Sequence, residues 1–211
     1  TMKDELTEEE KDELNNGRSE NPQGRPYKKI INDYGDMSPA QRTILDLLIK
    51  RAETFKNASK NERKRIMKSG GPESPIIVET DASNTGVDAR LFDLTAPDHP
   101  KSKVNRVINN VLRIYRENSQ ATQVIFMQRG LSDFKTKTHT AANGEKYEEK
   151  IPTHNISKEI VAKLVAEGIP RKEIAIVNGS TSKEKRAEIA DAMNRSEIRL
   201  VIGTTETLGV G

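Results

Sequence analysis

Arg199-Leu-Val-Ile-Gly-Thr-Thr-Glu-Thr-Leu-Gly-Val-Gly211 is the stretch on which the fold prediction depends. Its residues Leu200 to Gly203 predict a short buried strand. The strand leads directly into threonine hydroxyls and two glycines spaced Gly-x-Gly, a composition typical of loops that contact phosphate. Because the stretch ends at the second glycine, we expect this sequence to be part of a longer protein.

The segments before this stretch alternate between short apolar strands and capped amphipathic helices. In chain order the expected elements are a helix that begins at Ser102, a strand at 123–128, a helix at 156–168, a strand at 173–177, a helix from the capping box Thr181-Ser-Lys-Glu184 to Asn194, and a strand at 198–203. Such alternation implies right-handed crossovers and a parallel sheet with helices on both faces. Ligands bind such sheets at the carboxyl ends of the strands, so the loops after 128, 177 and 203 are the candidate site.

Two of these loops carry similar polar residues. Asn178-Gly-Ser-Thr-Ser182 joins a strand to a helix N-terminus, where free N–H groups and the hydroxyls of Ser180 and Thr181 suit a phosphate oxygen. Gly203-Thr-Thr205 repeats the arrangement at a neighbouring strand. A capped helix after a turn needs the same residues for structural reasons, so both interpretations stay open.

The first hundred residues differ in composition from the rest. Residues 1–36 are expected to be a charged, partly disordered segment that contains a brief strand at 27–34. Residues 37–100 are expected to be a helical, basic linker or insertion region. Its helices begin at Ser38-Pro39 and at the capping box Ser59-Lys-Asn-Glu62, and a strand is expected at 75–80.

The run from Lys50 to Lys68 holds eight bases against two acids, a net charge of +6. A basic stripe of this kind can neutralise phosphates, although a solvated helix face would have the same composition. The connection at 129–155 is unusually long. A mobile surface loop is the first interpretation; Asn143-Gly144 could instead turn a hairpin between Thr138 and Glu148, with Lys135, Lys137 and His139 near nucleic acid.

Composition excludes several classes of function. The chain has no cysteine, which removes disulfides, thiolate nucleophiles and zinc–thiolate sites, and its three histidines lack metal-ligand spacing. No phosphate-cradling G-x-x-x-x-G-K-[ST] motif is present. No apolar window is long enough to span a membrane and the N-terminus has no signal pattern, so a cytoplasmic protein is expected.

Several stretches, taken in order, resemble one family. Met37-Ser-Pro-Ala-Gln-Arg42 resembles the M-S-P-x-Q-R segment that precedes the second motor lobe of Snf2-type, superfamily 2 helicase-like ATPases. His99-Pro100 with Ser102-Lys-Val104 is similar to the start of that lobe, and 123–128 to its motif IV strand. Asn178 to Arg186, continuing to Met193-Asn194, has the spacing of D-G-S-T-x-x-x-x-R … F-N. Gly203 to Gly211 resembles motif V, L-S-T-R-A-G-G-L-G, position for position.

The resemblance implies an α/β fold: an incomplete RecA-like (P-loop NTPase-like) lobe at 101–211 that contains motifs IV to V. By position, four residues would contact the backbone phosphates of DNA: Gly179, Ser180, Thr204 and Thr205. Gly209 and Gly211 would approach ATP at the cleft with the first RecA-like lobe of the same polypeptide. The complete protein would use ATP and Mg²⁺ to drive translocation, with no membrane partner and no metal held by this chain.

Some positions depart from the family pattern. Glu206 stands where many members have Arg, Leu208 replaces a Gly, and Met193 replaces a Phe. Motif VI, with its arginine finger, and the first lobe, with its P-loop, are expected outside residues 1–211, so this fragment alone is expected to be inactive. The motif V variant also resembles large bacterial, phage and mobile-element proteins that join such a motor to a DNA adenine methyltransferase. The alternative is a non-catalytic module that binds nucleic acid or a partner; a Rossmann-type enzyme would need a glycine-rich first turn, and none is visible.

Overall fold

The computed structural model describes residues 30–140 and 144–208, and the chain divides into two compact units, Thr1–Tyr34 and Gly35–Gly211. In the first unit only 30–34 are described, and they form neither helix nor strand. Ile30 and Ile31 are 69% and 70% exposed. The brief strand expected at 27–34 is therefore absent from the described part of that range, and 27–29 lie outside it.

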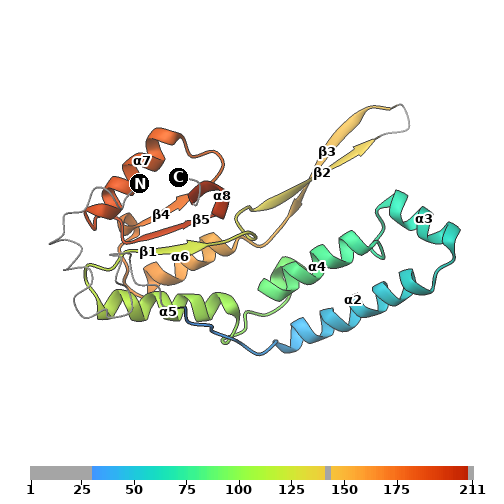
Figure 1. The fold of residues 1–211 in the computed structure, drawn as a ribbon, viewed down its shortest axis with the longest axis horizontal. Helices are drawn as coiled ribbons and strands as arrows, with labels where there is room; N and C mark the ends of the chain where they lie inside the picture. Colours follow the sequence, from blue (N-terminus) through green and yellow to red (C-terminus); the bar gives the residue numbers. More distant parts are fainter. Residues whose placement is uncertain (1–29, 141–143, 209–211) are drawn as a thin grey trace, which may run out of the picture. The chain divides into compact units, whose positions relative to one another are not determined.

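The second unit contains helices and two small sheets (Figure 1). Its elements are α2 (Pro39–Asn57), α3 (Lys60–Ser69), α4 (Pro75–Val87), the 3-10 turn η1 (Ala89–Leu91), α5 (Lys103–Glu117), β1 (Gln123–Phe126), β2 (Phe134–Thr140), β3 (Lys146–Pro152), α6 (Ile156–Ala166), the 3-10 turn η2 (Arg171–Glu173), β4 (Ile174–Val177), α7 (Lys183–Asn194), β5 (Leu200–Gly203) and α8 (Thr205–Leu208). The α/β class predicted from the sequence is confirmed.

The three-stranded sheet is parallel, as the sequence predicts, with the strand order β1-β5-β4. β5 is the central strand and all four of its residues are buried. In the register of the sheet, Gly203 pairs with Phe126 of β1 on one side and with Val177 of β4 on the other. The carboxyl ends of the three strands are therefore aligned.

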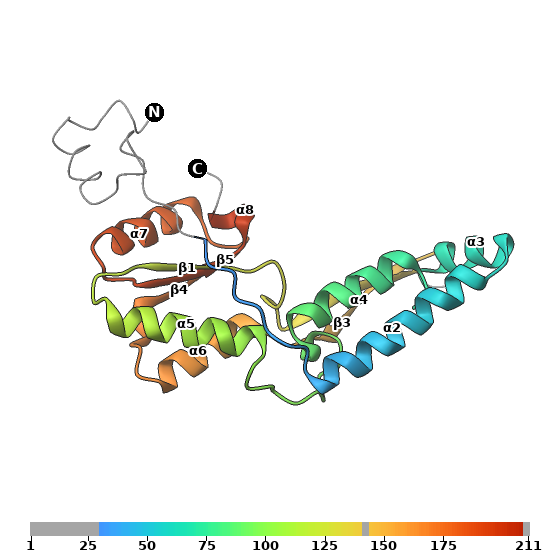
Figure 2. The same ribbon diagram turned by 60° about the horizontal axis from the view of Figure 1, so that its bottom comes forward.

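Helices cover both faces of this sheet (Figure 2). On one face α5 and α6 pack against it through an apolar cluster, whose fully buried members include Ile160, Leu164, Leu200 and Ile202. On the other face α7 contributes Ile189, which packs against Val177 and Val201. The period of apolar residues along each helix explains which face it presents to the sheet.

The helices before the sheet begin at the caps that the sequence indicates. Ser38 and Ser59 each accept a hydrogen bond from the backbone N–H three residues on, completing two capping boxes. Ser102 caps α5 through its hydroxyl, which accepts from the Asn105 N–H, without a capping box. Because a cap satisfies an otherwise orphaned N–H group within one turn, it is a local signal and could be predicted from a few residues.

The strand predicted at 75–80 is wrong, because these residues begin α4. The apolar, β-branched run there is typical of a strand, but Val78 and Ala82 lie one helical turn apart and pack against Ile44 and Leu48 of α2. Packing against another helix thus overrides local preference. Residues 81–86, which follow that run, are also part of α4.

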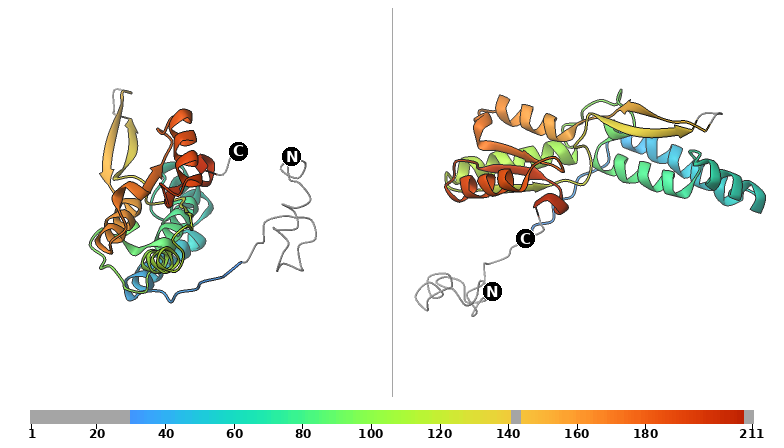
Figure 3. Two further views of the ribbon diagram at one scale, coloured as in Figure 1. Left: turned by 90° about the vertical axis from the view of Figure 1, so that its left-hand side faces the viewer. Right: turned by 90° about the horizontal axis from the view of Figure 1, so that it is seen from above.

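The long connection at 129–155 is a β-ribbon rather than a loop without secondary structure. β2 and β3 pair as antiparallel strands, and Thr138 lies opposite Glu148, the pair that the hairpin interpretation predicted. Every residue of β3 is exposed. Figure 3 shows the ribbon extending away from the three-stranded sheet, and the intervening 141–143 lie outside the described residues. Among the described residues, no helix has the length and apolar character needed to cross a membrane.

Candidate functional site

The candidate site is the edge of the sheet where β1, β4 and β5 end. Because Phe126 and Val177 both pair with Gly203, the loops that follow these strands start side by side (Figure 1). This is the edge at which open parallel sheets bind their ligands. The loops after β4 and β5 carry Gly179, Ser180, Thr204 and Thr205, and the sheet therefore brings all four predicted residues to one edge.

The loop after β4 is organised by Asn178. Its side-chain Oδ1 accepts hydrogen bonds from the Ser180 N–H at 3.1 Å and the Ser180 hydroxyl at 2.6 Å. The Thr181 hydroxyl accepts from the Asn178 N–H at 3.1 Å. Arg186 of α7 donates to the Thr181 carbonyl at 3.1 Å and so fixes the loop to the helix. The Ser180 hydroxyl is thus partly committed to the turn itself.

Ser182, and not Thr181, caps α7, since its hydroxyl accepts from the Lys185 N–H at 3.2 Å. The predicted cap was one residue too early because adjacent hydroxyls give the same local signal. The N–H groups of Gly179, Ser182 and Lys183 have no hydrogen-bond partner within the described residues. Such groups at a helix N-terminus, with the Lys183 ammonium on the same turn, attract an anion.

Gly179 is exposed, and a Cβ atom added to it would meet nothing within 4 Å. Its φ also lies outside the left-handed region. Neither local packing nor backbone conformation therefore requires glycine at this position. A glycine at this position leaves the backbone open to close approach by a ligand.

The loop after β5 is packed more tightly. Thr204 and Thr207 exchange hydrogen bonds, because the Thr204 N–H donates to the Thr207 hydroxyl at 3.0 Å and the Thr207 N–H donates to the Thr204 hydroxyl at 3.1 Å. A Cβ atom on Gly203 would lie 2.7 Å from Leu208 and 2.8 Å from the Val177 carbonyl. Gly203 is therefore required by packing.

Thr205 and Glu206 are the exposed residues after β5, and the Thr205 hydroxyl has no hydrogen-bond partner in the part of the chain that is described. Of the four residues predicted to contact phosphate, Gly179 and Thr205 have polar groups without a partner among the described residues. Ser180 and Thr204 instead make hydrogen bonds within their own loops. Gly209 and Gly211, the residues predicted at an ATP cleft, lie outside the described residues.

The basic run at 50–68 is partly structural. Arg51 forms an ion pair with Asp81 of α4 at 3.2 Å. Arg63 donates to the carbonyls of Phe55 and Lys56 at the end of α2 and lies over the Phe55 ring. No residue of α3 is buried, so its remaining basic side chains are exposed to solvent. This agrees both with a surface that neutralises phosphates and with an ordinary solvated helix face.

A second polar cluster was not predicted from the sequence. Arg90 of η1 is buried and donates to both oxygens of Asp88 at 2.8 Å and to Glu159 of α6 at 3.0 Å. Glu159 also accepts from Lys163 at 2.6 Å and contacts His154 at 2.7 Å. Asp98 also pairs with Arg90, at 3.3 Å. Asp88 and Glu159 are separated from each other by about seventy residues of chain, so no local sequence signal could reveal the cluster.

The charges of this cluster stabilise one another. Burial alone would raise the pKa of the Asp88 carboxyl, but the hydrogen bonds from Arg90 outweigh burial and hold the pKa below its usual value. Burial likewise opposes ionisation of Glu159, and the bonds from Lys163, His154 and Arg90 hold its pKa low. Because each charge has an opposite partner, the cluster ties η1 to α6 and offers no vacant ligand position. No group of metal-ligating side chains is found among the described residues.

No protein-family model and no curated protein matches this chain. What can be said of its function therefore depends on the arrangement of its own residues.

Proposed function

We propose that residues 101–208 belong to the second RecA-like lobe of a Snf2-like, ATP-dependent DNA translocase or helicase. In this proposal the loops after β4 and β5 contact the nucleic-acid backbone. One observation carries it: Val177 and Gly203 are paired neighbours, and the loops that follow them present unpartnered donors at the carboxyl edge of a parallel sheet. The ordered sequence motifs supply the family assignment.

The donors on this edge suit phosphate oxygens. The N–H groups of Gly179, Ser182 and Lys183 and the hydroxyl of Thr205 can each donate one hydrogen bond, and Lys183 adds a positive charge. None of these groups projects the large planar or bidentate side chain that distinguishes one base edge from another. Binding should therefore follow the backbone, depend on salt concentration and show little sequence preference.

In the complete protein, ATP and Mg²⁺ would be held by a first RecA-like lobe, and this lobe would close on them. The edge described above would then shift along DNA as the lobes open and close. The 211-residue chain would bind nucleic acid without hydrolysing ATP, because in this proposal the phosphate-cradling loop and the arginine finger belong to other parts of the polypeptide.

The proposal is tested by comparing two glycine-to-alanine variants. Gly179→Ala adds a methyl group where the backbone is expected to meet phosphate. Gly86→Ala makes the same change on α4, where a Cβ atom also meets nothing within 4 Å. Affinity for a fluorescein-labelled 20-base-pair duplex at low salt is measured by fluorescence anisotropy.

We expect Gly179→Ala to weaken duplex binding about fivefold, the effect of roughly 1 kcal/mol, and Gly86→Ala to leave it unchanged. Circular dichroism checks that both variants are folded. Failure of the unaltered chain to bind the duplex, or equal affinities of the two variants, would refute this assignment of the edge.

A further inference from the structure

β1 lies at the edge of the sheet, and among the described residues no strand is hydrogen-bonded to its outer side. The N–H groups of Gln123 and Met127 donate to the Arg199 and Gly203 carbonyls of the β5 side, each at 2.8 Å. Since backbone groups alternate along a strand, those of Val124 and Phe126 face away from β5. Within the part of the chain that is described, the backbone N–H and carbonyl groups of these two residues have no hydrogen-bond partner.

The side chains along this edge are apolar and exposed. Phe126 is 57% exposed and Val124 is 44% exposed. Natural edge strands are usually protected by a charge, a proline or a bulge, because an unprotected edge pairs with other chains. β1 has the sequence Gln-Val-Ile-Phe and carries none of these protections.

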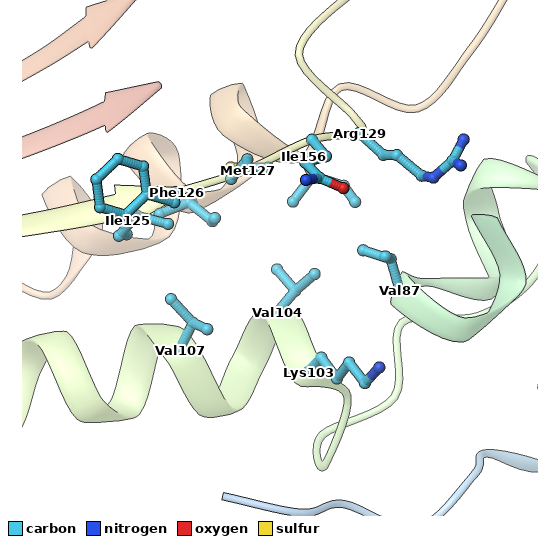
Figure 4. A pocket seen from close by; sticks show the side chains of 11 residues that line it. Val87, Lys103, Val104, Val107, Ile125, Phe126, Met127, Arg129 and Ile156 are labelled. Atoms are coloured by element: carbon cyan, nitrogen blue, oxygen red, sulfur yellow. The ribbon is translucent and has the colours of Figure 1, made fainter. Parts of the chain in front are cut away.

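A hollow of about 320 Å³ lies beside this edge on the α5 face (Figure 4). Val104 and Val107 of α5 line it from below, and Ile125, Met127 and Ile156 line it from the side of the sheet and α6. Its size lies at the lower end of the range of pockets that bind ligands, and its lining is mainly apolar. It can therefore receive an apolar side chain from a neighbouring segment.

A second hollow, of about 520 Å³, lies on the α7 face. Val124 and Val201 of the sheet and Ile189 and Met193 of α7 line it, and Phe126 lines both hollows. The free edge of β1 therefore runs between two apolar depressions. A strand placed along that edge would send successive side chains into one depression and then the other.

The charged residues that line the two hollows are all basic. Lys103 and Arg129 line the first, and Lys183 and Arg186 line the second, without any carboxylate. Lys103 and Lys183 have no hydrogen-bond or ion-pair partner within the described residues and are the first residues of α5 and α7. An occupant with carboxylates beside its apolar core would thus match the charge of this edge.

We propose that the free edge of β1 binds an extended peptide strand whose core is continuously apolar and whose flanks carry carboxylates. Backbone hydrogen bonds to Val124 and Phe126 would provide affinity, as in other cases where a strand is added to a sheet. Because side chains from both faces of the added strand would be covered, its core must be apolar at successive positions rather than at alternate ones. This inference does not rest on nucleic-acid binding, although Lys183 belongs to both proposed sites.

The test uses the full 211-residue chain and the acetylated, amidated peptide Asp-Asp-Val-Val-Ile-Val-Val-Asp-Asp. Hydrogen exchange of backbone amides is followed by nuclear magnetic resonance, and affinity is measured by titration. We expect slowed exchange at Val124 and Phe126, the amides that face away from β5. A peptide with proline in place of the central isoleucine should bind at least about tenfold more weakly, because it loses a backbone donor and an extended conformation.

Two variants locate the binding site. Val124→Pro removes an N–H group that makes no bond to β5, so the existing ladder is retained while the outer edge is blocked. Phe126→Lys introduces a positive charge beside the hollow on the α7 face, the face that residue 126 shares with Val124, without any change at the backbone. It serves if Val124→Pro does not fold. Each should reduce peptide affinity by about tenfold or more.

Three outcomes overturn the proposal. The first is no protection of Val124 and Phe126 at saturating peptide concentrations. The second is equal affinity for a peptide with lysines in place of the four aspartates, which would remove the argument from charge. The third is a dimer in sedimentation velocity experiments that Val124→Pro dissociates, which would assign the edge to a second copy of this chain.

Discussion

The ion-pair cluster around Arg90 and the loops that follow β4 and β5 are both polar. They differ in how many of their polar groups have a hydrogen-bond or ion-pair partner. Arg90 is buried and every charge around it has an opposite partner. At the sheet edge, Gly179 and Thr205 are exposed, and the N–H group of the first and the hydroxyl of the second have no partner among the described residues. The difference is consistent with a structural role for the first cluster and with the proposed role of the second in binding a ligand.

The same contrast exists within the sheet edge itself. Gly203 and Gly179 both occur close after a buried strand residue and before hydroxyls, so their sequence patterns are alike. Gly203 has no room for a Cβ atom, whereas Gly179 has open space. A glycine followed by hydroxyls therefore does not by itself indicate a phosphate site, and the surroundings of each glycine decide its role.

The largest effect on stability is expected from Arg90→Met. It leaves the Asp88 carboxylate without its main partner and removes one of the partners of Glu159, which keeps Lys163 and His154. Breaking a buried ion pair in this way typically costs about 3–5 kcal/mol. Urea denaturation measures the loss. Arg113→Met, which breaks an exposed pair with Glu117, is the matched control and should cost less than about 1 kcal/mol. Equal losses would contradict a structural role for the Arg90 cluster.

Gly203→Ala is expected to lower the free energy of unfolding by about 1–3 kcal/mol, because the added methyl group overlaps Leu208 and the Val177 carbonyl. Gly179→Ala should change it by less than about 0.5 kcal/mol. The two variants differ only in position, so thermal and urea unfolding compare the packed loop directly with the open one. A large destabilisation by Gly179→Ala would remove the argument that its glycine serves a ligand.

The Arg90 cluster should also give the stability a dependence on pH. The pKa values of Asp88 and Glu159 are lower in the folded chain than their usual 3.8 and 4.5. Their contribution is therefore present above these usual values and is lost as the pH falls through the lower folded values. Urea unfolding at pH 7, 5, 4 and 3 should show stability falling below about pH 4.5, and the fall should be shallower in Arg90→Met. A fall of the same steepness in both proteins would show that other carboxylates cause it.

The smallest expected effects concern the two adjacent threonines. Thr204→Val removes one half of the hydrogen-bond exchange with Thr207 and should cost about 1 kcal/mol of stability. Thr205→Val should leave stability unchanged and weaken duplex binding about threefold, since it removes one exposed hydroxyl donor. Fluorescence anisotropy and urea unfolding together separate the two roles. Weaker binding by Thr204→Val alone would reverse the assignment.

Much of the fold could be predicted because its signals are local. Ser38, Ser59 and Ser102 begin helices through contacts within one turn, and the buried runs of β4 and β5 have few alternatives in water. Residues 75–80 were predicted as a strand because the competing information, the packing of Val78 and Ala82 against α2, lies some thirty residues away. The β-ribbon at 134–152 was hard to predict from the sequence. Its strands are exposed on both faces and therefore lack the alternation of apolar and polar residues that marks a half-buried strand.

The candidate site could be predicted only in part. The order of strands and helices indicated the carboxyl edge, and the paired ends of β4 and β5 bring the predicted residues there. The sequence could not distinguish Thr204, which caps its own turn, from Thr205, whose hydroxyl is exposed. Nor could it indicate that Arg90 and Glu159 meet, because long-range ion pairs follow from the fold and have no fixed spacing.

The central claim is that the carboxyl edge of the sheet contacts the phosphate backbone, and the salt dependence of duplex binding tests it most directly. Lys183 begins α7 at this edge, and Lys172, in η2, precedes β4 at the opposite edge; both are exposed. If the claim is correct, affinity falls steeply with KCl concentration, and Lys183→Gln reduces the slope of log Kd against log[KCl] by about 1 while Lys172→Gln leaves it unchanged. Binding that does not respond to salt, or identical slopes for the two variants, would contradict the claim.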